Sequence, residues 1–173
     1  MLSAIVLACD AAEARLATPE AMVMSLGALV PAVVAALVRE ASIATVAGDA
    51  QMAEIAHHAG CALVEAATAA EALPVAIAAA HNPAVLVLRA GCVPEPGFIE
   101  ELVEFLQFGV DRGALLRQVP RNGLARLFPS LAPAAGLVGP KWAMQGKDQT
   151  SLQALARALR PQVVLRCRAT RIG

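Results

Sequence analysis

Hydrophobic and polar positions alternate in blocks along the first two thirds of the chain, and each block has the length of a strand or a helix. Short aliphatic runs predict buried strands at Leu2–Ala8, Ser42–Val46, Ala62–Val64 and Ala84–Leu88. The longer stretches between them are rich in alanine and predict helices. Strands that alternate with helices at this spacing predict an α/β fold with a mainly parallel sheet and right-handed crossovers.

Residues with specific roles at helix ends mark where the predicted helices begin and stop. Thr18-Pro19-Glu20 supplies an N-cap, a first-turn proline and an early acid. Asp49 follows Gly48 at the start of a second helix, which Gly60 closes. A third helix is predicted at Ala70–Ala80. Pro96-Gly97 begins a fourth, in which four large side chains share one face: Phe98, Leu102, Phe105 and Leu106.

The pattern loosens after Gly113, but it still predicts further elements without a linker or an internal repeat. These are a strand at Ala114–Val119, a short helix at Arg121–Phe128, a turn region at Pro129–Pro133, a helix at Ser151–Leu159 capped by Ser151, and a strand at Gln162–Arg166. We therefore expect residues 1–173 to form a single domain.

One uncharged stretch, Ala21–Val38, approaches the length of about 20 apolar residues that a membrane-spanning helix needs. It is rich in alanine and glycine, contains Pro31, and lies between Glu20 and Arg39. These features favour a buried helix followed by a turn.

Charge is balanced overall but unevenly distributed. The formal net charge of the 173 residues is +0. After Asp111 the only acid is Asp148, whereas basic residues are frequent there. The basic C-terminal third is either a solvated surface or a patch for phosphates, an anionic membrane surface or nucleic acid. Only Phe128 and Trp142 supply aromatic rings in this region, so we expect no nucleic-acid partner.

Several chemistries lack their sequence patterns. The cysteines at positions 9, 61, 92 and 167 form no C-x-x-C pair, and the three histidines have no metal-ligand spacing with a carboxylate. We interpret the cysteines as small core residues of a reducing, cytoplasmic compartment. No G-x-G-x-x-G or P-loop sequence follows a predicted strand, so a Rossmann oxidoreductase is not indicated.

With this layout, four stretches carry a resemblance to a known family: LSAIVLACDAAEARL, LGALVPAVVAALVREASIATVAGDAQMAEIAHHAGC, VLVLRAGCVPEPGFIEEL and GLVGPKWAMQGKDQTSLQALARAL. The chain resembles a small family 2 glycosyltransferase of the GT-A fold, of the short bacterial type. The resemblance implies a three-layer α/β/α domain and, if the chain is active, a hexosyltransferase-like enzyme that binds a nucleotide-diphosphate sugar.

The resemblance also implies a donor site at the ends of the first, second and fourth strands. It places that site at Ala8, Asp10, Thr45, Asp49 and the segment Arg89-Ala90-Gly91. Thr45 stands near the position where family members carry an aspartate that contacts the base, and Asp49 lies downstream of it. Asp10 follows the first strand, where a base or ribose meets such sheets, but a simple turn with Ala11 and Ala12 is equally compatible.

The metal motif departs from the family pattern. Arg89-Ala90-Gly91 stands where an Asp-x-Asp would bind Mg²⁺ or Mn²⁺, so the residues do not support either metal. Arg89 could instead pair with the donor phosphates, because a guanidinium binds phosphate oxygens bidentately. The alternative is an arginine that points to solvent or pairs with Glu95.

The resemblance implies that Asp148 is the acid that deprotonates the acceptor hydroxyl. Asp148 could equally help to cap the helix that begins near Ser151. Two other functions stay open. The chain could be a non-catalytic GT-A-like binding module, or a nucleotidyltransferase of the molybdenum-cofactor type, although Cys9-Asp10-Ala11-Ala12 lacks the glycine-rich loop of those enzymes. The sequence also leaves open a homodimer and a peripheral membrane contact, through an apolar patch around Met22, Met24 and Leu26.

Overall fold

The computed structural model describes residues 1–11, 17–108, 113–120, 127, 132–147, 149–161 and 163–172. Strands and helices follow one another in the order β1 (Leu2–Leu7), α1 (Pro19–Val34), β2 (Val38–Val46), α2 (Ala50–Ala59), β3 (Ala62–Ala66), α3 (Ala69–Ala79), β4 (Ala84–Arg89), β5 (Cys92–Pro94), α4 (Phe98–Phe108), β6 (Ala114–Gln118), β7 (Ala134–Pro140), α6 (Lys141–Met144), α7 (Leu152–Leu159) and β8 (Val163–Arg171).

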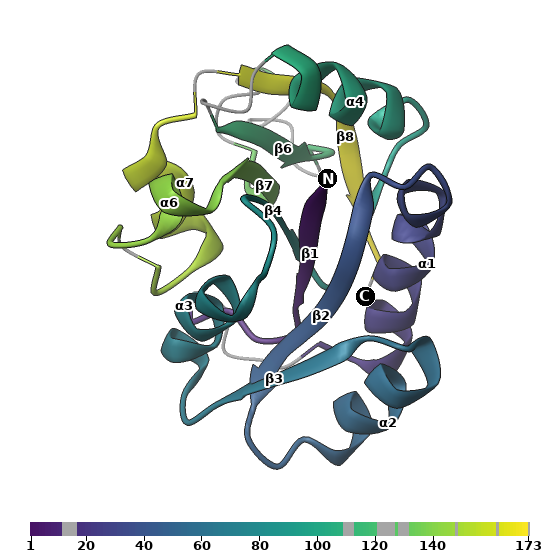
Figure 1. Cartoon of the computed structure of the whole chain (residues 1–173), viewed down its shortest axis with the longest axis vertical. Helices are drawn as coiled ribbons and strands as arrows, with labels where there is room; N and C mark the ends of the chain where they lie inside the picture. The colour runs from purple at the N-terminus through teal and green to yellow at the C-terminus, as the bar shows by residue number, and fades with distance from the viewer. Residues whose placement is uncertain are drawn as a thin grey trace.

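One eight-stranded sheet, in the order β3-β2-β1-β4-β7-β6-β8-β5, runs through the molecule (Figure 1). The β3-β2-β1-β4 half is parallel, as predicted. Beyond β4 the sheet is mixed, because β7 pairs antiparallel with both β4 and β6, and β5 pairs antiparallel with β8, whereas β6 and β8 are parallel. The predicted α/β fold is confirmed, with antiparallel pairing added in its second half.

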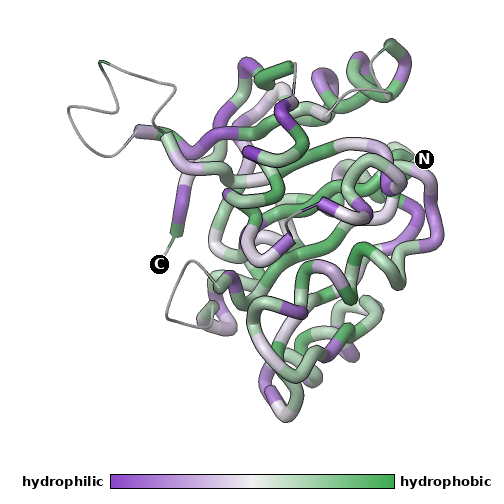
Figure 2. Tube along the Cα trace, turned by 90° about the vertical axis from the view of Figure 1, so that its left-hand side faces the viewer, coloured by the Kyte–Doolittle hydropathy of each residue, from purple (hydrophilic) through white to green (hydrophobic). Residues whose placement is uncertain are grey.

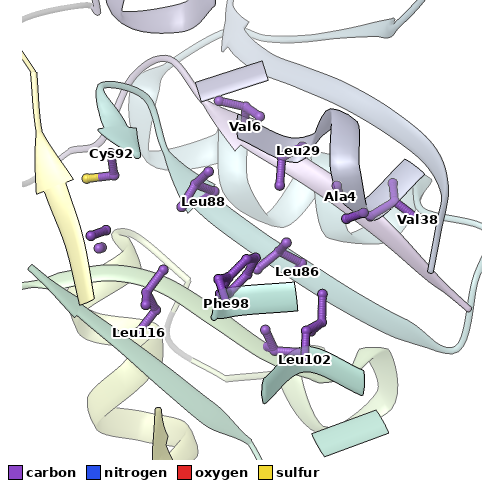
Figure 3. Packing of buried hydrophobic residues seen from close by; sticks show 14 of the residues in the cluster. Ala4, Val6, Leu29, Val38, Leu86, Leu88, Cys92, Phe98, Leu102 and Leu116 are labelled. Atoms are coloured by element: carbon purple, nitrogen blue, oxygen red, sulfur yellow. The ribbon is translucent and has the colours of Figure 1, made fainter. Parts of the chain in front are cut away.

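Helices cover both faces of the sheet, which makes three layers (Figure 1). Residues of α1, α2 and α4 share one buried cluster with the sheet, and residues of α3, α6 and α7 share the other. Phe98 and Leu102 of α4 lie against Leu86 of β4 in the first cluster (Figure 3). Hydrophobic stretches accordingly run through the middle of the molecule (Figure 2). This burial of aliphatic surface is the main favourable contribution to folding.

The predicted helix ends are confirmed where the structure describes them. Thr18 Oγ1 accepts a hydrogen bond from the Ala21 amide at 3.3 Å, and Ser151 Oγ accepts one from the Ala154 amide at 3.0 Å. Asp49 caps α2, and Gly60 ends it in the left-handed conformation, with φ +66°. The predicted helix at Arg121–Phe128 and the turn at Pro129–Pro133 lie largely outside the described residues.

Most of the uncharged stretch Ala21–Val38 belongs to α1, which continues past Pro31 to Val34. Among the described residues, none of the helices is long and apolar enough to cross a membrane. The buried residues Met22, Leu29 and Ala32 of α1 pack on the sheet. The predicted turn follows at residues 35–36, but the helix is buried on one face only, since Val23, Val30 and Val34 are among its exposed residues.

Sequence patterns missed β5 and β7. The sequence of β7, AAGLVGP, has few β-branched residues and therefore lacks a strand signal. A Cβ added at Gly136 would lie 2.9 Å from the Val87 carbonyl oxygen. The small residue thus serves the close approach of two backbones, which only the assembled sheet reveals.

A polar cluster joins three elements near the amino ends of the parallel strands. Glu40 of β2 accepts hydrogen bonds from the Ser3 hydroxyl of β1 and, at 2.7 Å, from the His81 amide just before β4. The His81 ring Nδ1 lies 2.8 Å from the other Glu40 oxygen, and the Asn82 side chain donates to Ser3 at 3.0 Å. Burial of Glu40 raises its pKa, but the hydrogen bonds from Ser3 and His81 outweigh burial and lower the pKa to about 2.

We predict that Glu40→Gln lowers the free energy of unfolding at pH 7 by about 1 kcal/mol, because its partners keep hydrogen bonds to a weaker acceptor. The lowered pKa means that the Glu40 carboxylate stabilises the fold above its ordinary pKa of 4.5 and loses this effect as the pH falls towards 2. The difference between wild type and variant in urea unfolding should therefore shrink across this window. Glu104→Gln, at an exposed position in the middle of α4, is the control and should show little difference at either pH.

Candidate functional site

The carboxyl ends of β1, β2 and β4 lie side by side, because these three strands are parallel neighbours. The Ala8 amide donates to the Ala44 carbonyl at 2.9 Å, and the Ala90 amide donates to the Leu7 carbonyl at 3.0 Å. These bonds continue the sheet one residue beyond the strands. They bring the predicted residues Ala8, Asp10, Thr45 and Arg89 to one edge, which is where ligands bind in open α/β sheets.

Asp10 and Arg89 form a buried ion pair at this edge. Arg89 Nη2 donates to Asp10 Oδ2 at 2.8 Å, and the two side chains are only 8% and 3% exposed. The pair joins the end of β4 to the segment that leaves β1. Each charge depends on the other, because either one buried alone would carry its full desolvation cost.

Both alternatives offered for Arg89 as a structural residue were wrong. The side chain does not point to solvent, and its ion-pair partner is Asp10 rather than Glu95. Glu95 is exposed and instead accepts a hydrogen bond from the Arg168 amide at 3.1 Å. Sequence separation misled the prediction, since Asp10 and Arg89 are 79 residues apart but end neighbouring strands.

The first turn of α7 also contacts Asp10. The Leu152 amide donates to Asp10 Oδ2 at 3.4 Å, at the end of a helix where the backbone dipole favours an anion. Nothing in the sequence marks this contact, because Ser151 already explains the start of α7 as its own N-cap. Asp10 therefore links β1, β4 and α7 and does more than shape a turn.

Thr45 and Asp49 form a second group at the end of β2. Thr45 is fully buried, and its hydroxyl donates to Asp49 Oδ2 at 3.3 Å. Asp49 Oδ1 accepts from the Met52 amide at 3.2 Å, so this carboxylate also caps α2. Cys9, which sequence analysis did not select, belongs to the same region: burial, followed by the charges of Asp10 and Asp49, raises the pKa of its thiol. A raised pKa disfavours the thiolate, so Cys9 is not an activated nucleophile.

Gly91 lies where the chain turns from β4 into β5. Its amide donates to the Ala21 carbonyl at 3.1 Å, and its carbonyl accepts from the Ile172 amide at 2.7 Å. Gly91 has φ +79°, and a Cβ placed there would lie 2.7 Å from the Ile172 carbonyl oxygen. Ala90 beside it is buried. The segment Ala90-Gly91 is thus packed against α1 and the end of the carboxyl-terminal strand.

The residues at this edge do not fit a divalent metal. Arg89 places a positive charge at the end of β4, and the Asp10 carboxylate is already bound to it. Within the described ranges, no group of three or more His, Cys, Asp or Glu side chains is placed to hold a metal ion. The predicted base, Asp148, lies outside the described residues.

A large cavity lies away from this edge. It has a volume of about 760 Å³ and is lined by α1, α2 and the start of β2, including Val30, Ile55 and Arg39. Val23, Val30 and Val33, which are exposed on α1, line it. Met24 and Val34 are exposed on the same helix. Met22, expected to be part of an apolar surface patch, is instead fully buried in the core.

Comparison with known proteins shows similarity at the level of structure. No family model matches the chain, and no curated protein does. Glucosyl-3-phosphoglycerate synthase from Mycobacterium tuberculosis, in complex with Mn²⁺, UDP and glucosyl-3-phosphoglycerate, superposes with a TM-score of 0.65 and 16% identity, over 95% of this chain and 68% of that one. A mycobacterial protein superposes with a TM-score of 0.66 and 18% identity, over 99% and 64%.

The same synthase with Mn²⁺, UDP-glucose and phosphoglyceric acid superposes with a TM-score of 0.56 and 20% identity, over 83% of this chain and 58% of that one. In the last two comparisons the chain spans less than two thirds of the solved structure. At such low identity these similarities show the fold alone, and the chain has the GT-A fold.

We predict that Arg89→Met lowers the free energy of unfolding by about 3–5 kcal/mol, because it leaves Asp10 buried without its cation. The double variant Asp10→Leu/Arg89→Met should recover much of this loss, since it buries no charge at all. Urea unfolding at neutral pH measures both, with Arg39→Met at an exposed position as the control. Losses that simply add in the double variant would contradict a coupled pair.

We also predict that Gly91→Ala destabilises the fold by about 2 kcal/mol or more, because it adds a clash with Ile172 to the cost of a positive φ. Gly97→Ala is a matched control: Gly97 has φ +95°, but an added Cβ meets nothing within 4 Å. It should cost about 1–2 kcal/mol from backbone strain alone. Equal losses in the two variants would show that the contact with Ile172 is not tight.

Proposed function

We propose that the protein binds a nucleotide-diphosphate sugar at the carboxyl ends of β1, β2 and β4 and transfers the sugar to an acceptor without a metal held by an Asp-x-Asp motif. The observation that carries this proposal is the convergence of Asp10, Thr45, Asp49 and Arg89 at that edge of a GT-A fold. Solved structures of the same fold contain UDP and UDP-glucose, which supports the class of donor.

The two polar groups at this edge suit different parts of the donor. At the end of β2 the partly exposed Asp49 carboxylate, to which the buried Thr45 hydroxyl donates, suits the base, beside the backbone of Ala8. Arg89, at the position that the resemblance gives to the metal motif, suits the diphosphate. In this arrangement Arg89 would take over part of the charge stabilisation that a divalent ion supplies to a leaving diphosphate.

A non-catalytic nucleotide-binding module is the second candidate, and the Asp10–Arg89 pair favours it. Paired with Asp10, Arg89 adds no net positive charge to the edge, whereas a leaving diphosphate develops negative charge that needs compensation. A site of this kind can hold a ligand more easily than it can accelerate transfer. Binding without turnover would therefore assign the protein to this candidate.

Several wider features stay predictions. They are the assignment of residues 1–173 to one domain, a cytoplasmic location, a homodimer and a peripheral membrane contact. The exposed apolar side chains of α1 support the last two, because contiguous apolar surface is characteristic of interfaces.

We expect calorimetric titration to detect binding of UDP or GDP and of their sugars, with the same affinity whether or not Mg²⁺ or Mn²⁺ is present. Asp49→Asn keeps the shape of the base-proximal group but removes its charge, and should weaken binding by about tenfold if that carboxylate contacts the base. Glu54→Gln, at an exposed position on α2, is the control. A folded protein that releases no heat with any nucleotide would refute the proposal.

The transfer step has its own test through Asp148. If Asp148 is the general base, Asp148→Asn should lower sugar transfer to an acceptor mixture by about 10²-fold or more while leaving the affinity for the donor unchanged. Donor hydrolysis and transfer can be followed by release of the nucleoside diphosphate. Equal rates in wild type and variant would remove Asp148 from the reaction.

A further inference from the structure

The cavity of about 760 Å³ between α1 and α2 is not explained by the proposed donor site. Its lining includes residues 38–41 at the start of β2, whereas Thr45 and Asp49 lie at and just after the other end of that strand. Both helices border the cavity on the same side of the sheet (Figure 1). A volume of this size falls within the range of small-molecule sites.

Helix α1 has a second apolar face besides the one that packs on the sheet. After Glu20, the only polar side chain of this helix is the buried Ser25. Val23, Val30 and Val33 line the cavity, and they are 53%, 54% and 49% exposed. A helix that is apolar on all sides is normally buried on all sides. The second face of α1 therefore suits an apolar ligand or partner.

Gly27 distinguishes an inserted ligand from a flat covering surface. It lies in the middle of α1, where glycine is less favourable for a helix than alanine. A Cβ added there would meet no atom within 4 Å, so no contact in the described part of the chain requires a glycine. Gly27 lines the cavity together with Leu26 and Val30. Its missing side chain widens the cavity, and a flat surface resting on the exposed valines would leave this space empty.

The charged side chains that line the cavity indicate the head group of the ligand. Glu40 already accepts hydrogen bonds in the polar cluster at the amino ends of the strands, including one from the His81 amide at 2.7 Å. Glu54 Oε1 lies 3.8 Å from Nε2 of His58, one turn further along α2. Arg39 is exposed and forms no ion pair with any residue that the structure describes. The cavity thus offers one cation to an anionic group.

We call this cavity the α1–α2 groove and define it by six of its lining residues: Val23, Gly27, Val30, Val33, Ile55 and Arg39. We propose that the α1–α2 groove binds a free fatty acid, with its chain along α1 and its carboxylate paired with Arg39. From Val23 to Val33 the helix rises by about 15 Å, which suits an extended chain of medium length. An acyl chain carries no polar atom, so its burial against the valines is favourable and leaves no polar group unpaired.

The test is calorimetric titration of the whole protein with dodecanoate, below the concentration at which it forms micelles. Gly27→Leu should abolish saturable binding, because the new side chain occupies the space of the ligand chain. Gly27→Ala is the matched control: it adds one methyl group and should weaken binding by about fourfold or less. Absence of saturable binding to the wild type, or unchanged binding to Gly27→Leu, would overturn the proposal. No nucleotide takes part, so the outcome is independent of the proposed donor site.

Gly27→Leu also separates exclusion of the ligand from damage to the fold. Leucine and alanine both favour a helix over glycine, and the added Cβ meets no atom, so both variants should unfold at a temperature higher by about 2 °C. Loss of binding in a more stable variant cannot be ascribed to a damaged fold. A Gly27→Leu protein that unfolds at a lower temperature than the wild type would show that the groove is not open at Gly27, which contradicts the site.

The position of the carboxylate is tested with Arg39→Gln. This variant should bind dodecanoate about tenfold more weakly, because it loses a charge-assisted contact. It should bind dodecanol, which has the same chain without the charge, as the wild type does. Arg157→Gln, at an exposed position on α7, is the control and should affect neither ligand. Equal weakening of both ligands by Arg39→Gln, or of dodecanoate by both variants, would contradict a carboxylate at Arg39.

A second copy of the chain and a membrane surface are the other occupants that suit exposed valines, and two measurements identify them. Sedimentation at several protein concentrations shows whether the wild type forms a homodimer that Gly27→Leu dissociates. Phosphatidylcholine vesicles show whether the protein binds a lipid surface and loses this binding in Val30→Asp. Either result without binding of dodecanoate would assign the groove to that occupant and overturn the fatty-acid site.

Discussion

The buried ion pair between Asp10 and Arg89 is the interaction on which the carboxyl edge of the sheet depends. It connects the segment after β1 to the end of β4, and its carboxylate also accepts the amide of Leu152 in α7. Because both charges are removed from water, neither can be lost or turned away without exposing the other to a large desolvation cost. Any ligand at this edge therefore meets a preorganised pair and not two independent charges.

The position of this edge and its chemistry have different origins. The GT-A fold brings the ends of β1, β2 and β4 together whatever residues stand there. The residues decide what the edge can bind, and here they supply a buried cation, Arg89, that is paired with Asp10. Backbone hydrogen bonds connect Gly91, just after β4, to Ala21 of α1 and to Ile172 at the end of the chain's last strand. The fold alone therefore does not fix the chemistry of this edge.

The two ends of the parallel strands are stabilised by different means. At the amino end, Glu40 accepts hydrogen bonds from Ser3 and His81 and forms a partly exposed cluster with them. At the carboxyl end, the contacts are buried and involve full charges. An exposed cluster adjusts to solvent and pH, whereas a buried pair holds one geometry. The end with the buried ion pair is the one that carries the proposed donor site.

Much of the fold could be predicted from local patterns. Short aliphatic runs gave β1 and β4, and the residues Thr18, Asp49 and Ser151 marked helix starts, because capping depends on atoms within three residues. Strand β7 could not be predicted, since its glycines matter only against the backbone of β4. Of the candidate site, the sequence indicated Asp10, Thr45, Asp49 and Arg89 but not the contacts among its distant parts.

By itself, the sequence determined the order of strands and helices in the first half of the chain and the presence of Arg89-Ala90-Gly91 at the end of the fourth predicted strand. Only the tertiary structure decided that Arg89 pairs with Asp10 instead of Glu95, and that Gly27 of α1 lines a cavity shared with α2. The physical reason is the separation along the sequence over which each interaction acts. Helix capping and hydrophobic periodicity act between near neighbours in the sequence, whereas an ion pair across 79 positions exists only after the parallel strands have aligned.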